Sequence, residues 1–191
     1  VFIPIAAMSM SFRATIKGDA NDARAIVLTH RATMESESSL TREEVATIVD
    51  HAQVSRDSRN RPVASGEVVL IAPVSRKRDH TDVNVTLRGV GQQYFAMRPE
   101  LKLRSGRLFE SGKQELVVGA GAVSQFDGLD MGKNIRLQDG DWKVVGTFAG
   151  GNGARESEVV ADALTVMSAY KLDSYNSLTV TLRSPRELAG Q

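Results

Sequence analysis

Two glycines, Gly119 and Gly121, follow an apolar run in the segment ELVVGAGAVS of residues 115–124. A strand, a glycine-rich turn and a helix are the parts of a dinucleotide site, in which the backbone approaches a pyrophosphate. The third glycine of that fingerprint is replaced by Ser124, and Gly128 ends the predicted helix after about two turns. No Gly-Lys-Ser/Thr sequence follows, so the segment is not a Walker loop. Nucleotide binding by an enzyme domain is therefore the alternative hypothesis, and we expect an architectural turn.

Metal-binding and acid–base motifs are equally incomplete. The histidines His30, His51 and His80 have no neighbours at the spacing of metal ligands. Asp19, Asn21 and Asp22 resemble the start of a calcium loop, but the glycine and the closing glutamate of such a loop are missing. The carboxylate pairs Glu35/Glu37 and Glu156/Glu158 have no partnered His or Lys. We predict no catalytic, cofactor-binding or metal-binding residues and no cofactor.

The composition excludes further classes of chemistry and of partner. The sequence has no cysteine, which excludes disulfides and thiolate catalysis. A formal net charge of +1 and 5% aromatic residues give no general attraction to nucleic acid and no base-stacking surface. Basic clusters occur at 56–61 (RDSRNR) and 75–80 (SRKRDH). We interpret them as solvated loops, with a contact to a lipid headgroup or a partner as the alternative.

Both ends of the sequence resemble cuts in a longer polypeptide. Residues 1–12, VFIPIAAMSMSF, are apolar but fewer than the roughly 20 needed to span a bilayer. They fit either a buried or frayed terminal segment or the end of a transmembrane helix. Ser184, Pro185 and Glu187 are placed to begin a helix just before Gln191. We expect a domain excised from its parent.

The elements that position these residues follow from capping and alternation. Thr41 and Glu44 are spaced for a capping box, with Leu40 and Val45 placed for a hydrophobic staple. Asp162 is the predicted N-cap of a second helix that reaches Tyr170 and buries Ala163, Leu164 and Met167. Apolar runs and alternation predict strands at residues 25–30, 67–74 (fully buried), 83–87, 135–138, 142–148 (with a bulge at Gly146), 159–161 and 178–182.

Many short strands with few helices indicate a mixed α+β fold. Phe109, Val117, Phe126 and Trp142 are the predicted core anchors between short strands. Gly106 and Gly132 permit turns that a Cβ would strain. The segment 130–132 is therefore predicted to turn into a strand rather than to hold a ligand.

Residues 87–148 contain an ordered set of motifs, each weak alone. They are R-G-V at Arg88, Tyr94-Phe95, Gly106-Arg107 with Phe109, E-L-V-V-G with the small residues after it, Met131-Gly132 and W-K-V-V-G. In this order they resemble the periplasmic core domain of MacB-like and FtsX-like ABC transporter permeases. The flanking strands and helices fit as well, so the resemblance covers about residues 13–190.

This resemblance implies a fold with a βαβ-type subdomain, expected at 24–75 with 157–191, and a strand-rich subdomain between them. It implies the end of a transmembrane helix and a connector at 1–20 and an extracytoplasmic domain at 21–191, truncated at its C-terminal end. The implied function is non-catalytic and mechanical, in a permease of the bacterial inner membrane.

The implied partners follow from the same resemblance. They are a cytoplasmic ABC ATPase that acts through the parent permease, a periplasmic adaptor, lipoprotein or other substrate, and a second permease in a dimer, but no nucleic acid. A stand-alone ligand-binding domain is a further alternative. The exposed loops at 76–80 and 150–158 are the expected binding surfaces.

Overall fold

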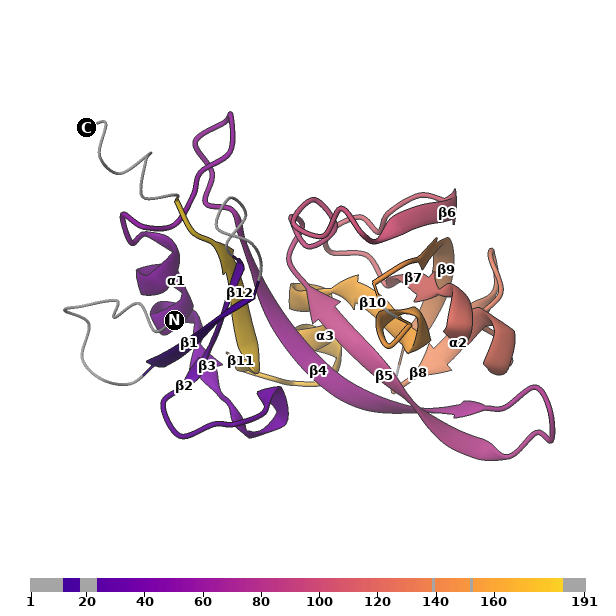
Figure 1. Cartoon of the computed structure of the whole chain (residues 1–191). Helices are drawn as coiled ribbons and strands as arrows, with labels where there is room; N and C mark the ends of the chain where they lie inside the picture. The colour runs from indigo at the N-terminus through magenta and orange to yellow at the C-terminus, as the bar shows by residue number, and fades with distance from the viewer. Residues whose placement is uncertain (1–11, 18–23, 139, 152, 184–191) are drawn as a thin grey trace. The chain divides into compact units, whose positions relative to one another are not determined.

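The computed structural model describes residues 12–17, 24–138, 140–151 and 153–183 (Figure 1). The fold is α+β and rich in strands, as predicted. In chain order the elements are β1 (Phe12–Lys17), β2 (Arg24–Thr29), the 3-10 helix η1 (Glu35–Glu37), β3 (Leu40–Thr41), α1 (Arg42–Val49), β4 (Ala64–Ser75), β5 (Asp82–Val90), β6 (Lys102–Gly106), β7 (Glu115–Gly119), α2 (Ala120–Gln125), β8 (Asn134–Leu137), β9 (Gly140–Ala149), the 3-10 helix η2 (Arg155–Ser157), β10 (Glu158–Asp162), α3 (Ala163–Ala169), β11 (Ser174–Tyr175) and β12 (Ser177–Thr181).

The chain divides into two compact units. Unit 1 contains the residues up to Glu67 and from Asp173 onward, and unit 2 is the continuous segment Val68–Leu172. The predicted discontinuous first subdomain is therefore confirmed, but its limits at 24–75 and 157–191 are wrong. Most of β4, together with β10 and α3, belongs to unit 2 because β10 pairs with β5 and β7 of that unit.

Unit 1 is an antiparallel sheet with one helix. Its strands follow the order β1, β2, β12 and the first residues of β4. Leu178 of β12 lies opposite Val27 on one side and Gly66 on the other. The core consists of buried side chains from the strands, from α1 and from the segment after it: Ala25, Val27, Leu40, Ile48, Val54, Leu178 and Val180.

The capping box of α1 is confirmed. The Glu44 backbone N–H donates to Thr41 Oγ1 at 3.2 Å, and the Thr41 backbone N–H donates to Glu44 Oε2 at 2.8 Å. Leu40 is fully buried and Val45 packs against the same core, as the predicted staple requires. Because these contacts are local, the sequence specified this end of the helix.

Unit 2 is a mixed sheet that begins with Val68 of β4. The strand order is β4, β5, β10, β7, β9 and β6, with β8 also on β9. β5 is parallel to β10, and β7 is parallel to β9, while the other pairs are antiparallel. One cluster of its core comprises Val90, Tyr94, Leu101, Val117, Val145, Phe148 and Val160, with Phe95 and Phe109 packed against it.

The predicted anchors and turns of unit 2 are confirmed. Val117 and Trp142 are fully buried, Phe126 is buried, and Phe109 packs on the core cluster. Gly106 and Gly132 have φ values of 71° and 81°, the left-handed region that glycine adopts without strain. The bulge predicted at Gly146 is also present: the β7–β9 register shifts as Val117 pairs with Gly146.

Two burial predictions are wrong. The strand at 67–74 is not fully buried, because β4 is antiparallel to its neighbour and alternates, leaving Ile71 60% exposed. In α3, Leu164 is exposed, and Val166 takes the place expected for it between Ala163 and Met167. The apolar pattern of a strand or a helix does not specify which of its apolar residues face the core until the neighbouring element is known.

Near the N-terminus the structure contains a strand that was not predicted. Residues 12–17 form β1, paired with β2 from Phe12 opposite Thr29 to Lys17 opposite Arg24. The predictions for residues 1–11, 18–23 and 184–191 lie outside the described residues. Within the part of the chain that the structure describes, no helix has the length and apolarity to cross a membrane.

Candidate functional site

The β4–β5 hairpin ends in an exposed basic turn, one of the predicted surfaces. Its strands pair as far as Ser75 opposite Asp82. The Arg76 backbone N–H donates to Thr81 O at 2.9 Å, and the His80 N–H donates to Arg76 O at 2.8 Å. His80 has a φ of 53°, so the turn is closed by a residue in the left-handed region. The hairpin thus ends in a defined loop.

The turn is fixed to the segment that follows α2. Arg76 forms an antiparallel bridge with Phe126. The Lys77 backbone N–H donates to Gln125 O at 2.9 Å, and the Asp127 N–H donates to Ser75 O at 2.8 Å. This backbone pairing gives the turn a fixed position in unit 2, although the two segments are about 50 residues apart in the chain.

The charged side chains of the turn are partly neutralised. Lys77 Nζ donates to Val123 O at 2.8 Å and to Asp130 Oδ1 at 2.9 Å. His80 Nδ1 lies 3.0 Å from Asp127 Oδ2. Hydrogen bonds from the Thr81 hydroxyl and backbone, with help from Arg76, lower the pKa of Asp79. Asp79 therefore stays ionised and holds the turn closed.

A shallow hollow of about 440 Å³ lies beside this turn. We call it the hairpin-tip surface. Its lining offers cationic groups, amide groups and one aromatic face, a combination suited to an acidic or polar partner segment. The lining residues are Arg76, Lys77, Arg78, Val83, Asn84, Ser124, Gln125 and Phe126.

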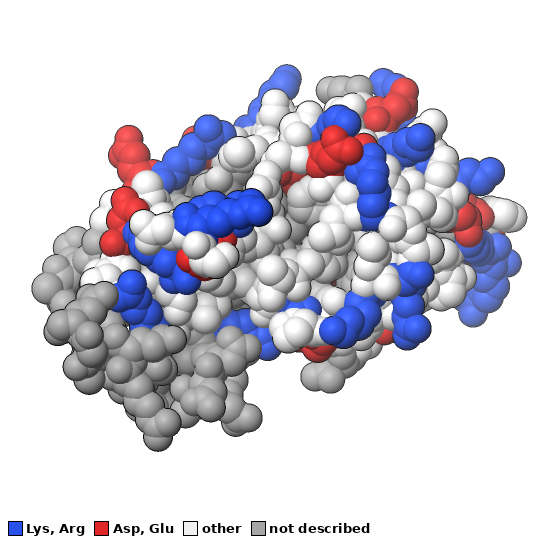
Figure 2. All heavy atoms as spheres, turned by 90° about the horizontal axis from the view of Figure 1, so that it is seen from above, with Lys and Arg blue, Asp and Glu red and all other residues white. Residues whose placement is uncertain are grey.

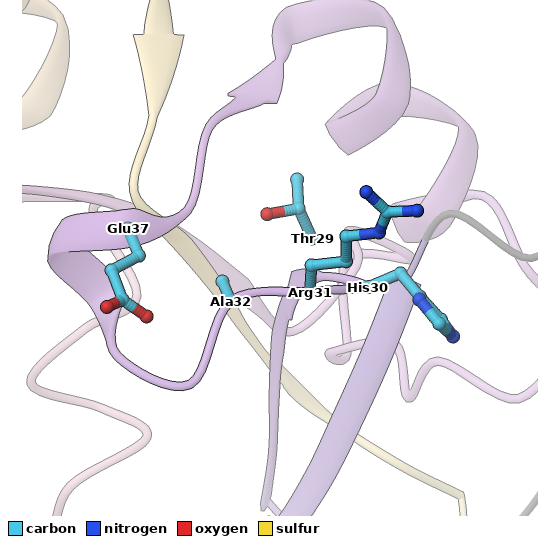
Figure 3. A pocket seen from close by; sticks show the side chains of 5 residues that line it. All are labelled: Thr29, His30, Arg31, Ala32 and Glu37. Carbon is cyan, nitrogen blue, oxygen red and sulfur yellow. The ribbon is translucent and has the colours of Figure 1, made fainter.

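A second hollow, in unit 1, is shown in Figure 3. Thr29, His30, Arg31, Ala32 and Glu37 line it. Figure 3 shows the His30 and Arg31 side chains directed away from Glu37, so the charged groups do not converge on one point. The Glu37 carboxylate instead accepts hydrogen bonds from the Thr33 backbone and hydroxyl, which lower its pKa. This geometry provides neither a metal site nor an acid–base pair.

The Gly119–Gly121 turn is occupied by protein backbone. Gly119 is the N-cap of the six-residue helix α2. A Cβ on Gly119 would overlap the carbonyl oxygen of Glu156, and one on Gly121 would lie 3.0 Å from the same oxygen. A carbonyl oxygen at this position would repel a phosphate rather than bind it. Because Gly119 and Gly121 lack a Cβ, η2 can pack closely against this turn. The two glycines therefore serve packing, as we expected of an architectural turn.

The remaining predicted chemical groups are engaged in structural contacts. Glu35 Oε1 accepts a hydrogen bond from Ser177 Oγ at 2.7 Å, and Glu156 Oε1 accepts one from the Gly150 backbone. His51 Nδ1 accepts from the Gln53 N–H at 3.3 Å. Among the described residues, no group of three or more His, Asp or Glu side chains could hold a metal ion.

One cluster was missed from the sequence, because Arg88 occupies a position where alternation predicts exposure. Arg88 is buried and donates to both carboxylate oxygens of Glu158, at 3.1 and 3.2 Å. Arg155 Nη1 lies 3.3 Å from Glu158 Oε2 and from Tyr94 Oη. The guanidinium of Arg98 lies 4.0 Å from the centre of the Tyr94 ring. These groups bind one another, which links β5, β10 and η2.

Known proteins share this architecture. The family model described as the MacB-like periplasmic core domain matches residues 1–189. The periplasmic region of MacB from Actinobacillus actinomycetemcomitans aligns with a TM-score of 0.63 and 16% identity, over 86% of this chain and 76% of that one.

A second solved structure aligns almost as well. The extracellular domain of the noncanonic ABC-type transporter YknZ from Gram-positive bacteria gives a TM-score of 0.60 and 18% identity, over 79% of this chain and 77% of that one. At these identities the likeness is one of fold, and no curated protein sequence matched the chain. The match over residues 1–189 shows that this chain belongs to the MacB-like periplasmic core domain family, the extracytoplasmic domains of MacB- and YknZ-like ABC transporter permeases.

Proposed function

We propose that this domain couples ATP hydrolysis in the cytoplasm to the binding or movement of a substrate or partner outside the inner membrane. Family membership over residues 1–189 is the observation that carries the proposal. In this proposal the residues before β1 are the end of a transmembrane helix, and the extracytoplasmic core domain begins with β1 (Phe12–Lys17) rather than at residue 21, because β1 pairs with β2 in the sheet of unit 1. The energy comes from an ABC ATPase that acts through the parent permease, so the domain needs no cofactor and no catalytic residue of its own.

The hairpin-tip surface supports a binding role. Its backbone is fixed by the pairing of Arg76 with Phe126, and Arg78 is highly exposed, with 79% of its side chain accessible. A fixed platform with exposed cations is suited to contact with an adaptor, a lipoprotein or a second permease. We therefore propose that the basic cluster at 75–80 contacts a partner and is not a solvated loop alone.

Coupling can be tested with dyes, because these 191 residues contain no cysteine, and any cysteine elsewhere in the permease or the ATPase is replaced by serine. The parent permease with its ATPase is reconstituted in proteoliposomes, with Glu43→Cys and Lys133→Cys labelled as a donor–acceptor pair. A second sample carries one dye on Lys133→Cys and a quencher on the lipid headgroups. We expect ATP to change the signal of at least one pair, and an ATPase variant that cannot hydrolyse ATP to abolish the change.

A pair within unit 2, Lys133→Cys with Ser168→Cys, is the matched control and should not respond. Both of its positions are exposed on one compact unit. If neither the pair that joins the two units nor the membrane pair responds to ATP, the coupling proposal is wrong. Clear micromolar binding of ATP or NAD to the isolated chain would instead favour the nucleotide alternative at Gly119 and Gly121.

A further inference from the structure

Strand β6 forms an exposed edge of the sheet in unit 2. It ends the strand order of that unit and, among the described residues, it pairs with β9 only (Figure 1). All five residues of β6 are exposed. In an edge strand, the N–H and C=O groups of alternate residues point away from the sheet and can pair with another chain.

The inner side of β6 is firmly held. Ser105 Oγ lies 2.8 Å from Thr147 Oγ1, and the Arg107 backbone N–H donates to Val145 O at 2.9 Å. The register shifts between Leu103 and Ser105, so Arg104 is the residue without a pairing partner on β9. The outer edge is therefore a preformed template, and an added strand would not have to order it.

Apolar side chains gather at this edge. Leu103, Leu108 and Met131 are 43%, 39% and 46% exposed, and they are three of the six exposed large apolar side chains among the described residues. The Met131 methyl group lies against Gly106, at the end of β6. A lysine and a bulge, which β6 has at Lys102 and Arg104, also protect an edge strand from indiscriminate pairing. An exposed leucine such as Leu103 gives no such protection.

The two charged residues of β6 itself, Lys102 and Arg104, are both basic. Figure 2 shows basic side chains spread over one face of the molecule, with fewer acidic ones between them. Lys102 and Arg104 form no ion pair with any residue that the structure describes, whereas Arg107 is held by Glu115 and Glu110. Two cations without acidic partners on an exposed edge are complementary to carboxylates.

We propose that β6 is a docking edge for an extended acidic segment of a partner protein. The segment adds a strand beside β6 through backbone hydrogen bonds. Its carboxylates face Lys102 and Arg104, and its apolar residues pack on Leu103, Leu108 and Met131. The proposal concerns this surface alone and does not depend on coupling to ATP hydrolysis.

The test uses the 191-residue chain and a fluorescent peptide of about eight residues that alternates Glu and Val. We expect saturable binding by fluorescence anisotropy, and no binding of a matched peptide that alternates Lys and Val. The double variant Lys102→Glu/Arg104→Glu should bind the acidic peptide about tenfold more weakly or worse, and should gain affinity for the basic one. Leu103→Ser should weaken binding of the acidic peptide without a change in charge preference.

The matched control is Arg42→Glu/Arg59→Glu, which changes the net charge equally at exposed positions of unit 1. It should bind the acidic peptide like the parent chain. Trp142 fluorescence checks that each variant keeps the fold of unit 2, since this tryptophan is fully buried.

Hydrogen exchange distinguishes strand addition from simple charge attraction. On peptide binding, the outward-facing backbone amides among residues 102–106 should become protected, and the amides of the hairpin-tip surface should not. Absence of binding, unchanged affinity in the charge-reversed variant, or binding without protection of β6 would each overturn the proposal. So would a concentration-dependent dimer that protects β6 without peptide, because the edge would then pair with a second copy.

Discussion

At the scale of single residues, Glu115 shows how one buried carboxylate can make stability depend on pH. It is 7% exposed at the start of β7, and its oxygens accept hydrogen bonds from Arg107 at 2.6 and 2.7 Å and from the Glu110 N–H at 2.9 Å. The Arg107 guanidinium, followed by the Glu110 backbone, lowers the pKa of Glu115 from 4.5 to about 2. The folded chain therefore holds this carboxylate in its charged form.

The sign of the resulting pH dependence follows from that shift. Because the pKa is lower in the folded chain, the stabilisation is complete above pH 4.5 and is lost as the pH falls toward about 2. Arg107 is half-exposed, so water screens the pair. We expect Glu115→Gln to lower the free energy of unfolding at neutral pH by about 1 to 2 kcal/mol. Urea unfolding at a series of pH values should show this difference shrinking in acid.

The neighbouring Glu110 provides the control. Its carboxylate contacts Arg107 and Lys113 but is half-exposed, with 52% of its side chain accessible. Glu110→Gln should therefore change the stability by less than about 0.5 kcal/mol. A constant difference between the parent chain and Glu115→Gln across the acid range would contradict the assignment.

At the scale of elements, the N-caps of α1 and α3 differ in burial. Thr41 caps α1 at the surface. Asp162, which is 3% exposed, accepts from the Thr165 backbone at 2.9 Å, from the Thr165 hydroxyl at 2.6 Å and from Ser111 Oγ at 2.8 Å. The acid at the start of α3 thus also ties the 111–112 turn to the helix, as a further bond from the Gly112 backbone shows.

This difference predicts unequal costs for the two caps. Thr41→Ala should lower the free energy of unfolding by about 1 kcal/mol, the usual value of an N-cap. Asp162→Ala should cost about 2 to 4 kcal/mol because buried donors also lose their acceptor. Asp162→Asn keeps one acceptor oxygen and should lie between them. Urea unfolding followed by circular dichroism measures all three, and equal costs for Thr41→Ala and Asp162→Ala would contradict the buried role of Asp162.

The caps were predictable and the strand pairing was not. Thr41, Glu44 and Asp162 act on backbone within three residues, so the sequence was sufficient to place both helix starts. Pairing between β5 and β10 joins segments about 70 residues apart, and it buries Arg88 against Glu158. No local pattern carries that information, because alternation describes which residues share a face and not what covers the face.

At the scale of the whole molecule, the two units differ in continuity. Unit 2 is the single segment Val68–Leu172, whereas unit 1 is assembled from two segments of the chain. Unit 2 has a core cluster of its own, which includes Tyr94 and Phe148. A continuous segment with its own core can fold without the remainder of the chain.

We therefore expect residues 68–172 to fold when expressed alone. Trp142, the only tryptophan of the sequence, lies fully buried in this unit and reports its packing. The fragment should show blue-shifted tryptophan emission that moves to the red in one cooperative transition with urea. Emission of an exposed tryptophan in buffer would contradict the prediction. The variant Val117→Ala serves as a control, because its core cavity should shift the transition to lower urea.

The features that act over a few residues could be predicted from the sequence. These are the two capped helices, the glycine turns at Gly106 and Gly132, the core anchors such as Trp142, and the order of motifs that resembles the MacB-like family. Such features depend on backbone conformation and on the burial of single side chains. Both leave a local signature in the sequence.

The contacts between distant segments became known from the tertiary structure and not from the sequence. The tertiary structure placed the Glu156 carbonyl against Gly119 and Gly121, fixed the basic turn at Arg76 to Phe126, and left β6 as an exposed edge. Each of these depends on contacts between segments far apart in the chain, and the free energy of such contacts comes from packing and pairing rather than from local propensity. For this reason the β6 edge was defined by the fold alone, whereas the sequence had already marked the basic loop at 76–80 and the fold showed what holds it.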